Sequence, residues 1–150
     1  MSSRLFQIVR EEKGLAYNIY SYIDFLRDAG LFGVYLGVDP SHAQKAVDLV
    51  KEEILRLGRD GITREELDGV KSQLKGNLII GLESTSNRMN RLAKLEIYLN
   101  EYNPLEKTIK EIDSIEADDI VRLAREIINP DRFSITLLGP DKNDFVNVRV

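Results

Sequence analysis

The stretch SRLFQIVREEKGLAY, residues 3–17, combines a helical run, a glycine stop and the start of a strand. Gly14 ends the amphipathic run, as glycine commonly does at the C-terminus of a helix. Arg10 therefore lies in the last turn of the predicted helix, and Tyr17 opens the β-type run seven positions later. We expect the guanidinium and the phenol hydroxyl to point into one space, an arrangement that suits a peptide carbonyl or the oxyanion formed from it.

The pattern alone favours a simpler interpretation of the same two residues. An arginine at a helix end often binds its own helix carbonyls, and a tyrosine at the start of a strand often packs at a sheet edge. Gly14 has the same role in both interpretations, since it lets the backbone turn between helix and strand. The pattern therefore leaves both a functional and a structural role open for Arg10 and Tyr17.

Two runs of β-type residues follow this stretch. Leu15 to Phe25 and Leu31 to Val38 are joined by a polar turn over residues 27–30, which predicts an antiparallel hairpin. A third strand is expected over Phe133–Leu138, where apolar residues alternate again. Alternation in the first run predicts one shared face for the side chains of Tyr17, Ile19, Ile23 and Phe25.

The remaining segments carry helix signals. Asp39-Pro40 and the capping box at residues 63–66 each predict the start of a helix. The run that begins at residue 64 is expected to break at residues 84–87. Further helices are expected over residues 3–13, 104–112 and 117–128. This order predicts an α+β fold, with a small mostly antiparallel sheet and helices packed on one face.

Composition limits the classes of protein. The chain has 150 residues, of which 43% are hydrophobic, enough for one domain over residues 1–142 and a tail over residues 143–150 that we expect to be disordered. A net charge of −4 argues against a nucleic-acid partner. The apolar run at Leu78–Ile80 is too short to cross a membrane, so no membrane partner is expected. Arg4 and the charged residues 10–13 interrupt any apolar region near the start of the sequence, so we expect no secretory signal and a cytoplasmic location.

Metal and cofactor chemistry has few candidate ligands in this chain. His42 is the only histidine and there is no cysteine, so we expect no metal and no cofactor to be bound here. His42 follows Pro40 in the first turn of a predicted helix, where a solvated side chain is expected. Neighbouring carboxylates such as Glu65-Glu66 point in different directions on a helix and are interpreted as solvated groups.

Six segments, in this order and at these intervals, carry a resemblance to a known family. They are Ser3–Phe6, Arg10–Glu12, Gly14–Tyr17, Arg27–Phe32, Glu83–Thr85 and Leu138–Pro140. Together they resemble the second half of the zinc peptidases of the insulinase and mitochondrial-processing-peptidase family, family M16. The resemblance covers nearly the whole chain to about residue 142 and implies a truncated processing-peptidase-like domain.

The resemblance implies roles for two residues. In the family, an Arg and a Tyr at this spacing come from the half that lacks zinc, where they bind the substrate backbone and help to stabilise the tetrahedral intermediate. Arg10 and Tyr17 are therefore expected to be auxiliary catalytic residues. Family catalysis resembles HxxEH zinc hydrolysis, and a chain with one histidine has no HxxEH. We expect the chain to be inactive alone.

The resemblance also implies partners. Zinc is expected in an HxxEH half, either a missing N-terminal half or a companion subunit, and peptides are expected as substrates. In the family a strand and most of a helix precede the SRLF segment, whereas here Met1 comes just before Ser2 and Ser3. We expect a C-terminal part cut inside the second half, whose uncovered sheet edge makes the isolated chain a homo-oligomer. The alternative is a catalytically inert scaffold or interaction domain of an inactive paralogue.

Overall fold

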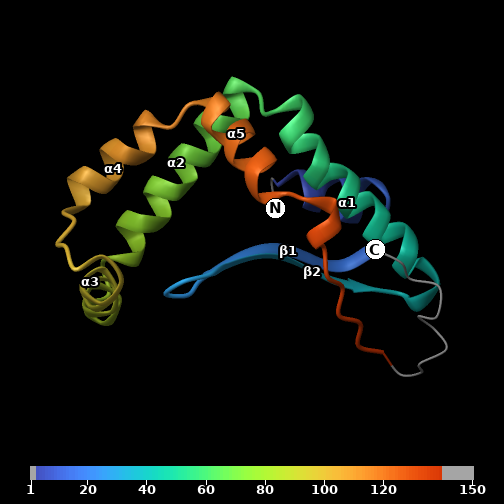
Figure 1. The fold of residues 1–150 in the computed structure, drawn as a ribbon, viewed down its shortest axis with the longest axis horizontal. Coiled ribbons are helices and arrows are strands. Elements are labelled where there is room, and N and C mark those ends of the chain that lie inside the picture. Colours follow the sequence, from blue (N-terminus) through green and yellow to red (C-terminus); the bar gives the residue numbers. More distant parts are fainter. Residues whose placement is uncertain (1–2, 140–150) are drawn as a thin grey trace. The chain divides into compact units, whose positions relative to one another are not determined.

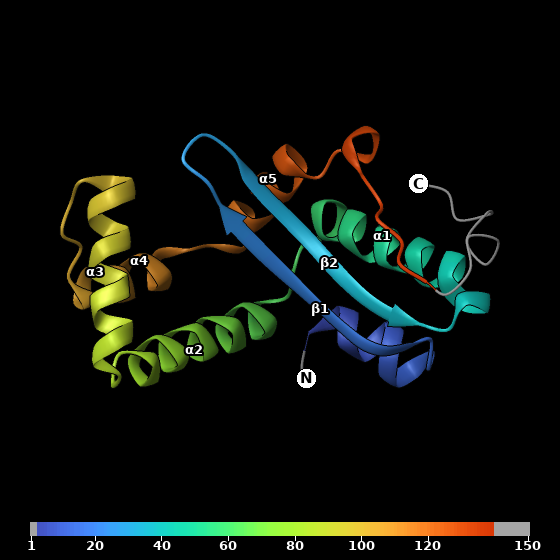
Figure 2. The ribbon, with the colours of Figure 1, turned by 90° about the horizontal axis from the view of Figure 1, so that it is seen from below.

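The structure is a computed structural model that describes residues 3–139. Within these residues the sheet has two antiparallel strands, β1 (Ala16–Phe25) and β2 (Gly30–Val38), which run side by side in Figure 2. The Leu26 N–H donates to the Ala29 carbonyl at 2.9 Å and closes the turn. The predicted hairpin is therefore confirmed, with strand ends within one residue of those expected.

A β-bulge interrupts β1 at Tyr17. Ala16 pairs with Val38 and Asn18 pairs with Gly37, so Tyr17 is an extra residue without a partner of its own on β2. The bulge shifts the alternation by one residue, and Ala16 and Ile19 are both buried although they are three positions apart. The face predicted to be shared by Tyr17 and Ile19 is therefore wrong, since Ile19 is buried and Tyr17 is exposed.

Two helices cover one face of the hairpin (Figure 1). They are η1 (Phe6–Glu12) and α1 (Ala43–Asp60), and both contribute to the buried core. The core residues are Val9 from η1, Ala46 and Val50 from α1, and Leu15, Ala16 and Ile19 from the start of the hairpin. The expected fold class, α+β with helices on one face of a small antiparallel sheet, is confirmed.

The helix predicted over residues 3–13 forms mainly as a π-helix. The Lys13 N–H donates to the Ile8 carbonyl at 3.1 Å, and the Leu15 N–H donates to the Val9 carbonyl at 3.0 Å. These bonds skip one or two residues more than an α-helical bond does. The wider spiral places Val9 fully inside the core, with no exposed surface.

The chain splits into two compact units. The first comprises Met1–Arg59 and Ala124–Val150, and the second comprises Asp60–Leu123. Entry into α1 in the first unit follows a short 3₁₀ turn, η2 (Pro40–His42), which Asp39 caps by accepting from the Ser41 N–H at 2.9 Å. The predicted helix start at Asp39-Pro40 is thus confirmed.

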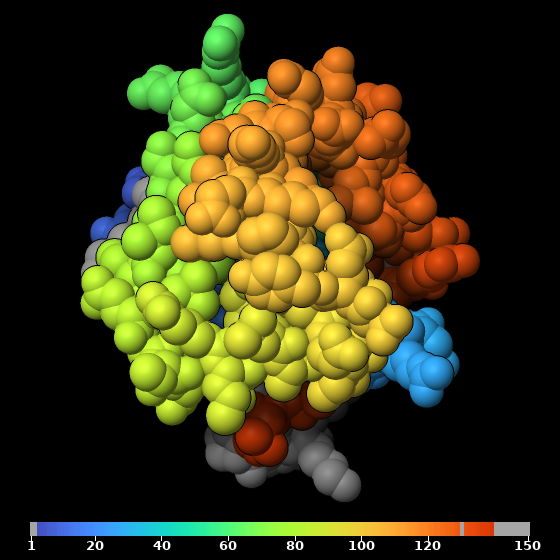
Figure 3. Space-filling view, turned by 90° about the vertical axis from the view of Figure 1, so that its left-hand side faces the viewer, coloured from blue at the N-terminus to red at the C-terminus, as the bar shows by residue number. Residues whose placement is uncertain are grey.

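The second unit contains α2 (Arg64–Gly81), α3 (Thr85–Leu99) and α4 (Leu105–Ser114), whose side chains face the viewer in Figure 3. Thr63 and Glu66 form the predicted capping box, since each side chain accepts a hydrogen bond from the backbone of the other residue. The predicted break between α2 and α3 is also confirmed, with Ser84 as the N-cap of α3. No helix within residues 3–139 combines the length and the apolar character needed to span a membrane.

The end of the described chain corrects one prediction. The helix α5 (Ala117–Ile127) and the short η3 (Pro130–Arg132) form, but residues 133–139 carry no regular secondary structure. The strand predicted over Phe133–Leu138 is therefore wrong. Alternating apolar residues do not make a strand without a neighbouring strand to pair with. The Phe133 ring contacts a helix instead, with Lys51 Nζ of α1 at 5.9 Å from its centroid. The tail predicted over residues 143–150, like Pro140 of the family-like segment, lies outside the described residues.

Candidate functional site

The sequence-predicted site begins with Arg10 in η1. Its guanidinium carbon lies 4.9 Å from the centroid of the Phe6 ring, and its Nε lies 4.0 Å from Glu11 Oε1. The side chain keeps 43% of its surface exposed. The aromatic ring supports the charged group by a cation–π contact, while much of the guanidinium remains accessible. The Phe6 ring therefore supports Arg10 at the helix end, and the ion pair that Arg10 forms with Glu11 is exposed.

Gly14 separates Arg10 from Tyr17 and sets the turn between them. Its φ is +59°, in the left-handed region that side chains other than glycine rarely adopt. The Gly14 N–H donates to the Arg10 carbonyl at 3.1 Å, which ends the helix. The predicted role of this glycine is confirmed, and the turn fixes the backbone on both sides of the candidate site.

Tyr17 is displayed by the bulge at the start of β1. The residue is 73% exposed, and within residues 3–139 its hydroxyl has no hydrogen-bond partner. Bulges re-aim a side chain relative to its strand and are frequent beside functional sites. Tyr17 thus presents a phenol that remains available for a ligand.

The structure does not join Arg10 to Tyr17 directly. In the described part of the chain no hydrogen bond, ion pair or ring contact links the two side chains, and Arg10 contacts Phe6 and Glu11 instead. Both side chains are accessible and flank the turn at Gly14. The functional and the structural interpretation of Arg10 and Tyr17 therefore both stay predictions.

A strip of tyrosines lies on the hairpin face opposite the core and was missed in the sequence. Tyr20 pairs with Tyr35 across the strands, with ring centroids 5.0 Å apart and an interplanar angle of 19°. The Tyr22 ring lies 6.3 Å from that of Tyr20 and extends over Gly33, its cross-strand partner. The three rings are each about half exposed. The signal that predicts this strip is the spacing of Tyr20 and Tyr22 at i and i+2, opposite a strand with Tyr35 and a glycine.

His42 is placed as the sequence predicts, at the start of a helix. Its backbone N–H donates to the Asp39 carbonyl at 2.9 Å. The Ser41 hydroxyl and N–H both donate to the Asp39 carboxylate, and these two hydrogen bonds lower the pKa of Asp39 below its usual value. The nearby His42 lowers the same pKa more weakly. These residues cap the start of a helix, so we interpret their role as structural.

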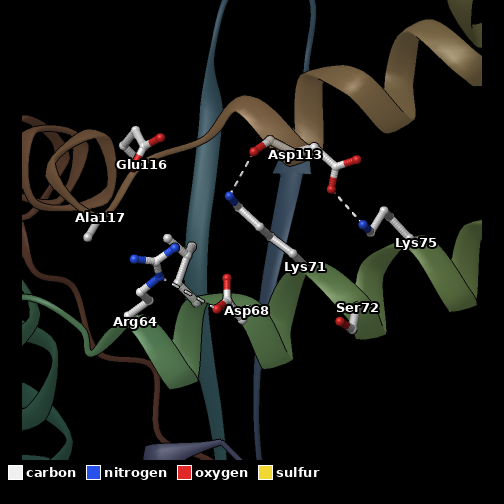
Figure 4. Close-up of a pocket in the computed structure, with 9 residues that line it drawn as sticks. Arg64, Asp68, Lys71, Ser72, Lys75, Asp113, Glu116 and Ala117 are labelled. Atoms are coloured by element: carbon white, nitrogen blue, oxygen red, sulfur yellow. Dashed lines mark hydrogen bonds and ion pairs between the residues drawn. The ribbon is translucent and has the colours of Figure 1, made fainter.

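A cleft of about 590 Å³ opens on the second unit and involves α2 and α4 (Figure 4). Lys71 Nζ donates to the Asp113 carbonyl at 2.9 Å, and Lys75 Nζ lies 2.5 Å from Asp113 Oδ1. The two amines therefore bind the C-terminal end of α4, where helix carbonyls carry partial negative charge. The cleft is lined by Arg64, Leu67, Asp68, Lys71, Ser72, Lys75, Asp113, Glu116 and Ala117. Since Lys71 and Lys75 already bind Asp113, we interpret the cleft as part of the contact that joins α2 to α4.

Side chains that could bind a metal lie apart from one another in the part of the chain that the structure describes. No three His, Asp or Glu side chains of residues 3–139 come together as metal ligands do. The sequence supplies one histidine and no cysteine, so the donors of a family-type zinc site are not available from this chain.

The comparisons with known proteins agree on one family. Residues 1–74 match the family model described as the peptidase M16 inactive domain. An uncharacterised zinc protease of Bacillus subtilis is 39% identical over 143 residues, which cover 95% of this chain and 35% of that protein. An uncharacterised zinc protease of Streptomyces coelicolor is 38% identical over 143 residues, which cover 95% of this chain and 31% of that protein. The chain thus spans about a third of the length of these curated relatives.

A solved structure shows the same fold. The crystal structure of a peptidase M16 inactive domain from Pseudomonas fluorescens superposes with a TM-score of 0.76 at 23% sequence identity. The match covers 85% of this chain and 30% of the solved chain. The arrangement of hairpin and helices is therefore one already seen in that class of domain.

Proposed function

Because the chain belongs to the peptidase M16 family, as an inactive C-terminal domain of a zinc protease-like protein, we propose that it supplies the substrate-binding half of a peptidase. In this proposal Arg10 and Tyr17 contact the peptide backbone at the reacting bond, and a separate HxxEH half holds the metal. The observation that carries the proposal is that two accessible polar side chains flank the turn at Gly14, one at a helix end and one on a bulge.

Arg10 is suited to bind the backbone of an extended peptide. Its guanidinium presents several N–H donors in a fixed plane, and peptide carbonyls are acceptors. The contact with the Phe6 ring restricts the rotamers of the arginine, so less side-chain entropy is lost when a carbonyl binds. Arg10 thereby positions the substrate and withdraws electron density from the carbonyl that it binds.

Tyr17 is suited to stabilise charge that develops during hydrolysis. Attack of water on a peptide carbonyl places negative charge on the carbonyl oxygen, and a phenol O–H can donate to that oxygen. The hydroxyl does not have to break a hydrogen bond within residues 3–139 before it donates to a substrate.

The family's zinc does not fit the residues of this chain. Three protein ligands are typical of a catalytic zinc site, and His42 is the only histidine of the sequence. Neither Arg10 nor Tyr17 binds zinc in the proposed role, since both act as hydrogen-bond donors. The metal and the general base are therefore contributed by the HxxEH half, which is the partner that we propose for this domain.

The alternative of an inert scaffold is not favoured. The curated relatives in Bacillus subtilis and Streptomyces coelicolor are both called zinc proteases. Retention of Arg10 and Tyr17 at accessible positions agrees with a role in a peptidase, because a scaffold does not need a phenol without a partner on a bulge.

Steady-state kinetics of the assembled peptidase test this proposal. Tyr17→Phe keeps the ring and removes the hydroxyl, so we expect kcat to fall by roughly a hundredfold while KM changes little. Arg10→Ala removes the group that binds the substrate carbonyl, so we expect KM to rise as well.

A matched control separates this role from a general effect of tyrosine loss. Tyr20→Phe removes a hydroxyl from the same strand but leaves the stacked ring, and we expect kcat to remain near that of the wild type. Wild-type kinetics for both Tyr17→Phe and Arg10→Ala would show that the pair is structural and would reject the proposed role.

A further inference from the structure

Phe6 contacts both the protein core and the guanidinium of Arg10. The Phe6 side chain is partly buried and packs against the core residues of the first unit. The guanidinium carbon of Arg10 lies 4.9 Å from the centroid of the same ring, within the range of a cation–π contact. The two residues are at positions i and i+4 of η1, so their side chains lie on the same side of the helix. One ring thus joins a fixed core to a charged, accessible side chain.

The backbone around Arg10 is held in place on both sides. Val9, the residue before it, is fully buried in the core. The Gly14 N–H donates to the Arg10 carbonyl at 3.1 Å, and the Phe6 N–H donates to Ser3 Oγ at 3.3 Å. Because the backbone is fixed, the direction of the guanidinium depends on the contacts that the arginine side chain itself makes.

The Arg10 guanidinium also forms an ion pair with Glu11, and this contact is weaker than the one with Phe6. Glu11 Oε1 lies 4.0 Å from Arg10 Nε, which is beyond hydrogen-bond distance, and both side chains are exposed. Exposed ion pairs contribute little, because water and salt screen the charges and two flexible side chains lose entropy. The Phe6 ring is already restrained by the core, so only the arginine loses freedom when it lies over the ring. We therefore expect Phe6, and not Glu11, to determine the direction of the guanidinium.

We propose that Phe6 is a positioning residue for Arg10, an inference that rests on the function proposed for Arg10 as a ligand of the peptide backbone. In this role the ring does not touch the peptide. It holds the guanidinium over its π face, so the N–H donors meet a peptide carbonyl from a restricted set of directions. If Phe6 served the core alone, another apolar side chain of similar size would replace it, and Arg10 would bind the carbonyl equally well without the ring.

Kinetics of the assembled peptidase with substitutions at Phe6 test the proposal. Phe6→Leu keeps an apolar side chain against the core and removes the π face, so we expect KM to rise roughly two- to fivefold with kcat little changed. Phe6→Met, whose flexible side chain fills irregular space, should give the same result without depending on how leucine packs. Phe6→Tyr keeps the ring and should retain the wild-type KM. Leu5→Val is the matched control, since Leu5 packs against the same core but carries no ring, and its KM should also be unchanged.

A double-mutant cycle with Arg10→Ala shows whether Phe6 acts through the arginine. The effect of Phe6→Leu on KM should disappear when Arg10 is already replaced by alanine. Nuclear magnetic resonance of this chain alone gives a readout that does not depend on activity. We expect an upfield ring-current shift of the Arg10 side-chain protons in the wild type and in Phe6→Tyr, and we expect Phe6→Leu to abolish it.

The outcomes separate this inference from the proposed function. If Arg10→Ala raises KM while Phe6→Leu leaves it unchanged, the positioning role of Phe6 is overturned and the proposed function stands. The positioning role is also overturned if Phe6→Leu raises KM equally in the Arg10→Ala background, because Phe6 would then contact the substrate or act through the fold. Wild-type kinetics for Arg10→Ala would instead reject the proposed role of the arginine, and the positioning role with it.

Discussion

The Tyr22 ring lies directly over Gly33, its partner across the β1–β2 hairpin, in the space that a side chain at position 33 would occupy. A Cβ at this position would overlap the outer atoms of the ring. Gly33 thus allows Tyr22 to lie close to the sheet beside the stacked pair of Tyr20 and Tyr35.

Gly33→Ala is expected to displace the Tyr22 ring with little loss of stability. The overlapping atoms are at the far end of a half-exposed side chain, which can rotate into solvent. We expect the free energy of unfolding to change by less than about 1 kcal/mol, since alanine also favours the strand over glycine. Nuclear magnetic resonance of the Tyr22 ring protons checks this. Gly37→Ala is the control, because its Cβ would lie 3.8 Å from Asn18 and touch no tyrosine. Unchanged Tyr22 shifts in Gly33→Ala would contradict the geometry.

Gly14→Ala and Gly69→Ala should change stability in opposite directions. Neither Cβ would meet an atom within 4 Å, so the two sites differ in backbone conformation and not in space. At Gly14 a left-handed φ of +59° makes alanine unfavourable by roughly 1–2 kcal/mol. Within α2, Gly69→Ala should stabilise the chain by about 1 kcal/mol. Urea denaturation of both variants measures the difference. Equal signs would mean that the turn at Gly14 is not left-handed in solution.

The ion pair between Lys75 and Asp113 should make a small contribution that depends on salt. Both side chains are partly exposed, so Lys75→Met is expected to lower stability by about 0.5 kcal/mol at low ionic strength and by less at high salt. Arg64→Met is the control, since Arg64 is almost fully exposed and lies 4.0 Å from Asp68. A double-mutant cycle with Asp113→Asn isolates the coupling. A coupling independent of salt would argue against a direct ion pair.

The pKa of Asp39 gives a prediction in acid. Hydrogen bonds from Ser41 lower the folded-state pKa of this carboxyl below its ordinary value of 3.8, so folding favours the charged form. The resulting stabilisation is fully present above the unfolded-state pKa and is lost as pH falls through the lowered folded-state pKa. Titration of the carboxyl carbon by nuclear magnetic resonance should show the depression. Ser41→Ala should move the pKa back toward 3.8, and an unchanged value would exclude the hydroxyl as its main cause.

Local signals in the sequence predict much of this fold. The capping box at Thr63 and Glu66, the N-cap at Asp39 and the polar turn before β2 each act within a few residues, and all three form as expected. Gly14 is another local signal, because its backbone conformation excludes most other residues.

The sequence pattern does not predict features that depend on pairing between residues far apart in the chain. The bulge at Tyr17 is defined by the register of β1 against β2, and alternation within one strand does not contain it. The segment after Arg132 has the alternation of a strand but pairs with neither described strand. The position of Tyr22 over Gly33 likewise requires the register. For the candidate site, the sequence identified Arg10 and Tyr17 on either side of the Gly14 turn, whereas the bulge that displays Tyr17 emerged from the structure.

In the proposed enzyme this chain supplies substrate contacts and an HxxEH half supplies the zinc. This arrangement is tested most directly by measuring zinc content and cleavage of a quenched fluorescent peptide in three preparations: this chain, an HxxEH half, and their mixture. We predict no stoichiometric zinc in this chain, because one histidine and no cysteine cannot supply the ligands, and we predict efficient turnover only in the mixture. Stoichiometric zinc with chelator-sensitive turnover by this chain alone would contradict the account.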